Sequence, residues 1–295
     1  MDARVVIGSA CSVGIGPEHG GRSQNEDNYL IALRGSALSR DEQGELRQVA
    51  QEGHGVMIAV ADGMGGHEQG EVASTAAVQA LAQLWQRGRP RDAERALAEW
   101  LPAAHTRARE RLVPQGRVNL GSTLTAAWIL GDRLGWIQVG DSRLYRLRSG
   151  NFWRLTRDQT HGEFAVRDRR EAGPNAAYPA QSFIYGSRGL GHDEDLRLDP
   201  GLDSGTFTLS VGDRLLLCTD GLSGFVSDER IANILARARD PQEAADDLVD
   251  LAMESGSDDN VTAVVLHVRS LPIAALVEDV VLDGEDDDTL VPWND

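Results

Sequence analysis

The 295-residue sequence contains no lysine, so its 29 basic side chains are all arginine. This absence excludes a Schiff-base lysine and a nucleotide-binding P-loop lysine as catalytic groups. Two cysteines, Cys11 and Cys218, are too few for a disulfide framework or a cysteine-ligated zinc site. Both stand in apolar, strand-like runs, and we expect buried free thiols in a reducing compartment.

Long apolar stretches are also missing. No run of about 18 apolar residues is present, and the N-terminus lacks the apolar core of a signal peptide. We therefore expect a cytoplasmic protein without a membrane span.

Negative charge dominates the composition. The 46 acidic residues give a net charge of −17, which argues against a nucleic-acid-binding surface and fits divalent cations and basic protein partners. Eight of these acids and no arginine lie in residues 271–295. We predict a folded domain over residues 1–270 and an acidic, flexible tail over 271–295. The tail either solubilises the chain, or its residues 273–281 or 285–288 contact the domain or a basic partner.

Apolar periodicity divides the chain into strands and pairs of helices. Strands are expected at residues 4–15, 28–33, 55–61, 124–130, 134–139, 144–148, 152–155, 206–211, 214–219 and 261–268, and helices at 71–85, 92–108, 228–237 and 241–253. Residues 35–54 and 157–190 are polar and turn-rich, so we expect loops there. Ser149-Gly150-Asn151 and Gly212-Asp213 predict hairpins. This order favours an α+β fold in which mainly antiparallel sheets form a sandwich flanked by helix pairs.

Several acidic residues stand where apolar strand runs begin or end: Glu26, Asp27, Asp62, Asp141, Asp220 and Asp259. One aspartate in an Asp-Gly turn is common. If all these strand ends converge, however, the carboxylates repel one another and cannot all stay ionised without a cation. Oxygen ligands select magnesium, manganese or calcium over zinc. Gly63, which follows Asp62, would let its own carbonyl approach a metal closely.

Two metal ions that share a carboxylate suit hydrolysis at phosphorus. Such chemistry also needs a group that binds phosphate, and an arginine offers two parallel donors. Arg22 lies four residues before Glu26, in the same segment as the first acids. Spacing alone equally allows Arg22 to be a surface residue in a charged turn.

Seven motifs together resemble the metal-dependent protein serine/threonine phosphatases of type 2C, the PPM family, in their bacterial form. They are GRSQNED at 21–27, VADGMGGH at 60–67, GST at 121–123, VGDSR at 139–143, LTRD at 155–158, DGL at 220–222 and DDNVT at 258–262. Each motif is weak alone, but the seven in the family's order are specific. The resemblance implies a four-layer α–β–β–α sandwich with a dinuclear manganese or magnesium centre between its sheets.

The resemblance also implies metal-binding roles for single residues. Asp62 is expected to bridge both ions and the Gly63 carbonyl to bind one of them. Asp220 and Asp259 are expected to bind the other ion. Asp141 matches a position that, with Asp220, supports a third, weaker metal site in this family.

Roles in catalysis follow from the same resemblance. Glu26 and Asp27 are expected to hold metal-bound water, Arg22 to bind the substrate phosphate, and a metal-bridging hydroxide to attack phosphorus without a phosphoenzyme. The eukaryotic branch has a candidate general-acid histidine where this chain has Met64. His67 is the nearest candidate; the alternatives are that a metal-bound water donates the proton and that His67 only bonds the backbone at a helix entry.

The chain departs from the family at one motif. After the Leu-Thr pair the family usually has Asp-His-Ser, whereas this chain has Asp158-Gln159-Thr160, with His161 one position later. Residues 162–187, which correspond to the family's flap, match loosely. The resemblance therefore implies no substrate preference.

We expect a monomeric phosphoprotein phosphatase that opposes a bacterial serine/threonine kinase, with that kinase and its targets as substrates. One alternative is a catalytically weak phosphatase-like binding domain, which predicts loss of a metal ligand, yet every ligand position is filled. Another is a two-metal hydrolase of small phosphate esters or of nucleic acid, and the acidic composition disfavours the latter.

Overall fold

The computed structural model describes residues 3–33, 35–41, 43–50, 52–65, 70–112, 120–160 and 203–272. These residues form two large antiparallel sheets. The five-stranded sheet has the order β1 (Arg4–Ser12), β14 (Val261–Ser270), β13 (Arg214–Cys218), β10 (Arg143–Arg148) and β11 (Asn151–Arg154). The seven-stranded sheet has the order β12 (Asp203–Thr208), β9 (Arg133–Val139), β8 (Leu124–Leu130), β5 (Val56–Ala61), β2 (Asn28–Leu33), β3 (Ser36–Arg40) and β4 (Leu46–Ala50).

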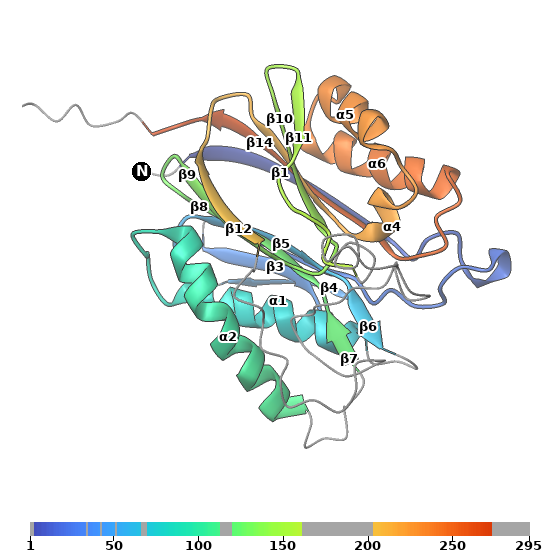
Figure 1. Cartoon of the computed structure of the whole chain (residues 1–295), viewed down its shortest axis with the longest axis horizontal. Coiled ribbons are helices and arrows are strands. Elements are labelled where there is room, and N and C mark those ends of the chain that lie inside the picture. The colour runs from blue at the N-terminus through green and yellow to red at the C-terminus, as the bar shows by residue number, and fades with distance from the viewer. Residues whose placement is uncertain are drawn as a thin grey trace, which may run out of the picture.

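Helices cover the outer face of each sheet. Figure 1 shows α1 (Gly70–Gln86) and α2 (Ala93–Leu112) beside the seven-stranded sheet. The short α4 (Asp220–Ser223), α5 (Asp228–Arg237) and α6 (Pro241–Glu254) lie on the other side, against the five-stranded sheet. A small sheet of β6 (Gly63–Gly65) and β7 (Leu120–Ser122) lies next to α1, and a 3₁₀ helix spans Pro17–His19. The predicted four-layer sandwich is confirmed.

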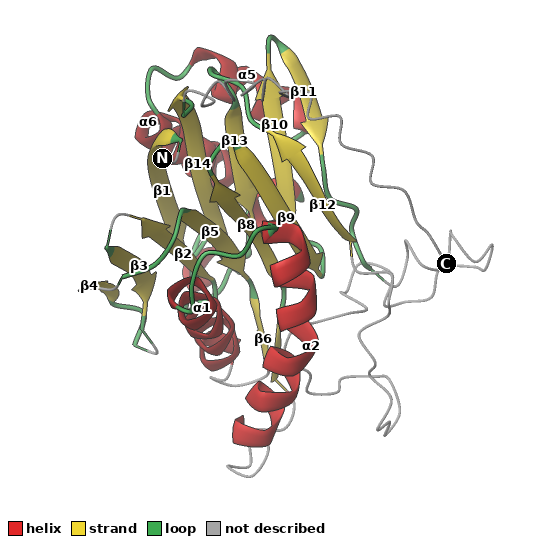
Figure 2. Cartoon of the chain, turned by 90° about the vertical axis from the view of Figure 1, so that its left-hand side faces the viewer, coloured by secondary structure: helices red, strands yellow, loops and turns green. Residues whose placement is uncertain are grey.

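Alternation along the strands divides the apolar residues into three cores. In β13, Leu215 and Leu217 face the seven-stranded sheet, whereas Leu216 and Cys218 face α4, α5 and α6. A strand buried on both faces reads as a continuous apolar run, which explains the RLLLC sequence of β13. The two sheets therefore pack face to face, with Leu215 and Leu217 against Ile58 of β5. Figure 2 shows the strands of both sheets in yellow, with α1 and α2 at one side of them and α5 and α6 at the other.

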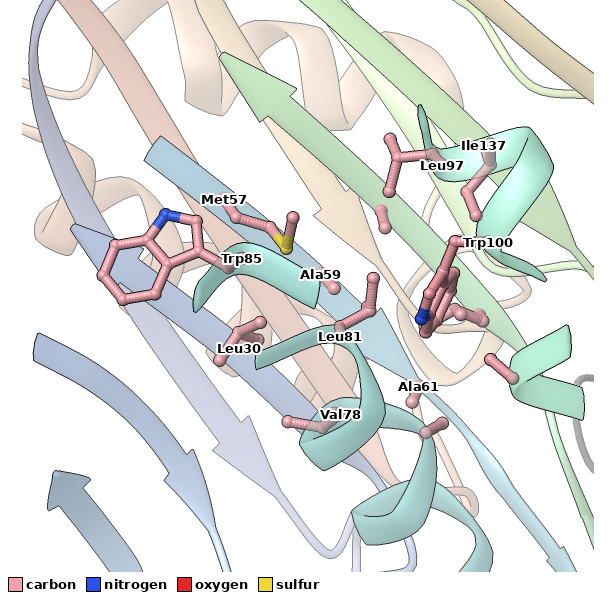
Figure 3. Packing of buried hydrophobic residues seen from close by; sticks show 14 of the residues in the cluster. Leu30, Met57, Ala59, Ala61, Val78, Leu81, Trp85, Leu97, Trp100 and Ile137 are labelled. Carbon is pink, nitrogen blue, oxygen red and sulfur yellow. The ribbon is translucent and has the colours of Figure 1, made fainter. Parts of the chain in front are cut away.

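The third core joins the seven-stranded sheet to α1 and α2. Figure 3 shows Trp85 and Leu81 of α1 packed over Met57 and Ala59 of β5, with Trp100 of α2 alongside. Small residues in β5 leave room for the large side chains of the helices, so the helices lie close to the sheet.

The expected loop over residues 35–54 is wrong, because most of this segment forms the β3–β4 hairpin. Arg40 pairs with Leu46, and the Asp41 carboxylate accepts hydrogen bonds from the backbone N–H groups of Gln43 and Glu45 within the turn. Every residue of β4 is exposed at the edge of the sheet. A strand without a buried face lacks the apolar alternation by which strands are predicted.

The predicted hairpin at Gly212-Asp213 is also wrong, whereas the one at Ser149-Gly150 is confirmed between β10 and β11. β12 belongs to the seven-stranded sheet and β13 to the five-stranded sheet, so the turn leads from one sheet to the other. The buried Asp213 carboxylate accepts two hydrogen bonds of 2.6 Å from Arg148 and one from the Ser210 N–H. These contacts fix the turn that connects the two sheets.

The structure bears on two features of the composition, the missing long apolar runs and the small number of cysteines. None of the helices in them is long and apolar enough to cross a membrane. Both cysteines are free thiols, as predicted; Cys218 is buried as expected, whereas Cys11 is only half-buried.

Two glycines let outer helices approach the sheets closely. A Cβ atom at Gly8 of β1 would lie 2.3 Å from the Gln242 nitrogen in the first turn of α6. One at Gly135 of β9 would lie 2.2 Å from the Glu94 nitrogen in the first turn of α2. The Gln242 side chain also bonds both main-chain groups of Ser9. Backbone-to-backbone packing therefore leaves no space for a side chain at either glycine.

We expect Gly8→Ala to lower the free energy of unfolding by about 1–3 kcal/mol, because the added methyl group must push α6 away from β1. Urea denaturation of the variant and the wild type measures this difference. Ser9→Ala is the matched control, since it adds no atom at the neighbouring position. Equal stability of Gly8→Ala and the wild type would contradict the close packing.

Candidate metal centre

Antiparallel pairing brings many strand ends to one end of the sandwich. In the seven-stranded sheet, the end of β5 pairs with the start of β2, and the end of β9 with the start of β8. In the five-stranded sheet, the end of β13 lies between the starts of β10 and β14. The predicted acidic residues adjoin these ends: Glu26, Asp27, Asp62, Asp141, Asp220 and Asp259. The structure therefore brings them together.

Asp27 links the two sheets at this end. Its Oδ2 accepts hydrogen bonds from Thr219 Oγ1 (2.8 Å), after β13, and from Thr262 Oγ1 (2.7 Å), in β14. The side chain is 2% exposed, and Oδ1 has no hydrogen-bond partner among the described residues. Burial, followed by the charges of Asp220 and Asp259, raises the pKa of Asp27 to about 7. Asp27 therefore has an oxygen free to hold a further polar group.

Asp62 lies at the centre of the carboxylates. Its N–H donates to Thr123 Oγ1, and the Thr123 N–H donates to its carbonyl oxygen, both at 2.9 Å. Burial raises the pKa of Asp62 well above its usual range, and the charges of Asp220, Asp27, Asp259 and Asp141 raise it further. Thr123 belongs to the GST motif at 121–123, but only the structure shows that it holds the main chain of Asp62.

Gly63 is enclosed by backbone. Its N–H donates to the Glu26 carbonyl oxygen (3.2 Å), and a Cβ atom on it would lie 2.1 Å from the carbonyl oxygen of Gly70. Only glycine fits in this position. A Cβ atom on Gly70 would lie 2.7 Å from the Gly63 oxygen and 2.6 Å from a Glu26 carboxylate oxygen, so these two oxygens face the same point.

The start of α1 holds Glu26. Glu26 Oε1 accepts a hydrogen bond from the Gly70 N–H (3.2 Å), and its carbonyl oxygen accepts one from Ser74 Oγ (2.6 Å). Burial raises the pKa of Glu26, and the neighbouring charge of Glu71 contributes to the rise. Glu71 Oε2 is buried without a hydrogen-bond partner among the described residues. Sequence analysis did not single out Glu71, because its position in the first turn of a helix is common for an acid.

Arg22 lies beside Asp259. Its Nε is 2.9 Å from Asp259 Oδ1, and its terminal nitrogen donates to Oδ2 at 3.0 Å. The side chain of Arg22 is exposed, so the guanidinium stands at the open side of the cluster. Asn260, the next residue, accepts the Glu26 N–H and donates to the Gln24 carbonyl oxygen. This pair of contacts fixes the segment that carries Arg22 and Glu26.

Asp220 and Asp141 complete the cluster. Asp220 begins α4, and burial, followed by the charge of Asp259, raises its pKa to about 6, while a hydrogen bond with Asp62 lowers it. Asp141 is 5% exposed, and burial followed by the charge of Asp220 raises its pKa well above the usual range. Oδ1 of each has no hydrogen-bond partner among the described residues.

Of the predicted site residues, His67 lies outside the described residues. So do residues 162–187 and nearly all of the segment 271–295.

The donor set fits hard divalent cations. All predicted side-chain ligands are carboxylates, and three of them have buried oxygens without hydrogen-bond partners among the described residues. Burial, followed by the charges of neighbouring carboxylates, raises the pKa values of Asp27, Asp62, Asp141 and Asp220. Among the described residues, no group of three or more histidine, cysteine, aspartate or glutamate side chains is already arranged to hold a metal ion. Asp259, for example, has both oxygens directed to Arg22.

Comparison with known proteins agrees with this geometry. The sequence model of the family described as protein phosphatase 2C matches residues 36–254. The chain belongs to this family. It is 36% identical over 252 residues to the serine/threonine protein phosphatase PstP of Mycobacterium tuberculosis. The aligned region covers 80% of this chain and 45% of the relative. This member of the 2C family thus spans about half the length of that relative.

Other members of the 2C family match over nearly their full length. The serine/threonine phosphatase Stp of Listeria monocytogenes is 28% identical over 244 residues, which is 77% of this chain and 94% of the relative. A crystal structure of M. tuberculosis PstP superimposes with a TM-score of 0.69, 28% identity and coverage of 90% and 99% of the two chains. The PstP catalytic domain in complex with two manganese ions gives a TM-score of 0.68 at 30% identity, with the same coverage. The expected family is therefore confirmed.

Cation binding should stabilise the metal-stripped protein. With manganese at about 100 times its Kd, mass action adds about 2.7 kcal/mol to the free energy of unfolding, which scanning calorimetry detects as a rise in Tm. Protons compete with the cation for carboxylates whose pKa values are raised. The rise in Tm should therefore shrink as the pH falls through about 7 and about 6, the values for Asp27 and Asp220.

Asp62→Asn should lose most of this stabilisation, and Asp258→Asn, at an exposed acid beside the cluster, should keep it. A manganese effect that grows as the pH falls would contradict binding by these carboxylates.

Proposed function

We propose that the chain hydrolyses phosphoserine and phosphothreonine in proteins with two bound divalent cations, manganese or magnesium. The observation that supports this proposal is the convergence of six acidic side chains at one end of a 2C-family sandwich; the pKa values of Glu26, Asp27, Asp62, Asp141 and Asp220 are raised there. The names of the relatives, serine/threonine phosphatases, support the substrate class.

The charge distribution supports the proposed ligand roles. Burial, followed by the charges of four other aspartates, raises the pKa of Asp62, so this carboxylate suits a position shared between two cations. The Gly63 carbonyl, beside Glu26, would bind one of them. Asp220 and Asp259 would bind the other. Asp141 and Asp220 would together hold a third, weaker cation. After burial, the charge of Asp220 is the largest contribution to the raised pKa of Asp141.

When bound, two divalent cations lower the pKa of water and neutralise charge on a phosphoryl group. The chain's own groups orient the reactants. The Arg22 guanidinium offers parallel N–H donors to the oxygens of a phosphate, and it already forms this type of contact with the Asp259 carboxylate. Glu26 and Asp27 each retain acceptor capacity toward the cluster and would hold ordered water there.

We infer further that the substrates include a serine/threonine kinase and its targets, and that the chain acts as a monomer. Residues 1–270 would form the catalytic domain, and 271–295 an acidic tail. The described sandwich continues to Ser270, the last residue of β14, which supports this boundary. The free thiols of Cys11 and Cys218 support a reducing, cytoplasmic location.

We expect the chain to release phosphate from a phosphothreonine peptide with manganese or magnesium and to be inactive with excess chelator. Asp62→Asn and Asp220→Asn should each reduce kcat at least about 100-fold, because each removes a charge that holds a cation. A malachite-green assay for phosphate measures this. Asp258→Asn is the control expected to retain wild-type turnover.

Folded wild-type protein that shows no turnover with any divalent cation would overturn the proposed function. Turnover of a small phosphate ester with none of several phosphopeptides would instead point to a different substrate class.

Arg22→Ala should lower kcat/KM for the same peptide by about 10- to 100-fold, since a charge-assisted hydrogen bond contributes about 1.5–3 kcal/mol. Initial rates over a range of peptide concentrations give kcat and KM separately. Because Arg22 is proposed to bind phosphate, the variant should still bind manganese. An unchanged kcat/KM would remove Arg22 from the site and leave it as a partner of Asp259.

A further inference from the structure

The loop that carries Asp141 is tied to the segment that follows β11. The Gln159 N–H donates to the Gly140 carbonyl oxygen (3.0 Å), and the Gly140 N–H donates to Gln159 Oε1 (2.9 Å). Gln159 is 3% exposed. One buried residue therefore bonds both main-chain groups of the residue directly before Asp141.

The neighbours of Gln159 make parallel contacts. The Arg157 N–H donates to Gln138 Oε1 (3.2 Å), and Gln138 Nε2 in turn donates to the carbonyl oxygens of Gly140 (3.0 Å) and Ser142 (3.2 Å). Arg143 donates two hydrogen bonds to Asp158, at 2.9 and 2.6 Å. Each residue from 157 to 159 thus bonds the stretch from 138 to 143, on both sides of Asp141.

The loop has little freedom to adopt another shape. Gly140 has a φ of +101°, and a Cβ atom on it would lie 2.6 Å from the side chain of Thr123. Ser142 Oγ lies 2.7 Å from Thr123 Oγ1, the same hydroxyl that accepts the Asp62 N–H. A continuous set of contacts therefore runs from Gln159 through residues 140–142 and Thr123 to Asp62.

Within this fixed backbone, the Asp141 side chain is buried with Oδ1 lacking a hydrogen-bond partner among the described residues. Its neighbour Asp220 has a second such oxygen. The charge of Asp220 acts on Asp141, and a cation held by the two carboxylates would relieve their repulsion.

We propose that Gln159 is a positioning residue for the divalent cation held by Asp141. Its side-chain oxygen, by accepting the Gly140 N–H, sets the direction in which the Asp141 carboxylate points. Cation binding at Asp141 therefore depends on a hydrogen-bond acceptor in the side chain at position 159. This inference rests on the proposed function for the identity of the cation, but its test is binding and not turnover.

The test is calorimetric titration of the metal-stripped full chain with manganese chloride alone. Gln159→Met keeps the length of the side chain and removes the acceptor, and the backbone bond from residue 159 to Gly140 remains possible. We expect the weakest manganese-binding event to weaken by about 10-fold or to disappear, and the tighter events to stay unchanged. Gln159→His, whose imidazole nitrogen can accept the Gly140 N–H, should restore it.

Controls separate positioning from a general effect on the fold. Gln48→Met makes the same replacement at an exposed residue of β4 and should bind manganese as the wild type does. Asp141→Asn should remove the same event as Gln159→Met, and the double variant should show no additional loss, because both changes act on one cation.

Three results would overturn the proposal: unchanged binding by Gln159→Met, additive losses in the double variant, or a wild type without any binding event that Asp141→Asn removes. Equal weakening of every event by Gln159→Met, together with a lower Tm, would also overturn it and assign Gln159 a purely structural role. Phosphopeptide turnover by the same wild-type preparation tests the proposed function separately, so the two can fail independently.

Discussion

Repulsion between carboxylates at one end of the sandwich is the constraint on which the rest of the site depends. Folding places Asp27, Asp62, Asp141 and Asp220 together, and burial with mutual charge raises the pKa of each. Such a cluster opposes folding unless protons or cations neutralise it. The same energy that makes the cluster costly in the absence of a cation makes it a strong binding site for one.

The surrounding chain limits this cost mainly with neutral donors. Threonine hydroxyls from Thr219 and Thr262 bond Asp27, and Thr123 bonds the main chain of Asp62. These groups orient the carboxylates without a positive charge that would compete with a metal ion. Arg22 differs, because it reaches Asp259 from the exposed side of the cluster, where a substrate phosphate would arrive.

Sequence patterns predicted the elements that have a buried face, and failed where tertiary pairing decides. The apolar run of β13 and the stripes of α5 and α6 were evident, since burial selects their residues. The β3–β4 hairpin was missed because every side chain of β4 faces solvent. The residues of Gly212-Asp213 do form a turn, but the next strand joins the other sheet because β13 pairs with β10 and β14, which are distant in the sequence, whereas β12 pairs with β9.

For the site, the sequence alone determined which carboxylates stand at strand ends, because Asp-Gly and Asp-Asn dipeptides after or before apolar runs are local features. It also carried the family motifs that name their roles. Only the tertiary structure decided which groups support them. The hydroxyls that hold Asp27 and the Gln159 amide that bonds Gly140 come from segments far along the chain or from another sheet. Hydrogen bonds between such segments follow from strand register and sheet packing, which no local pattern of residues encodes.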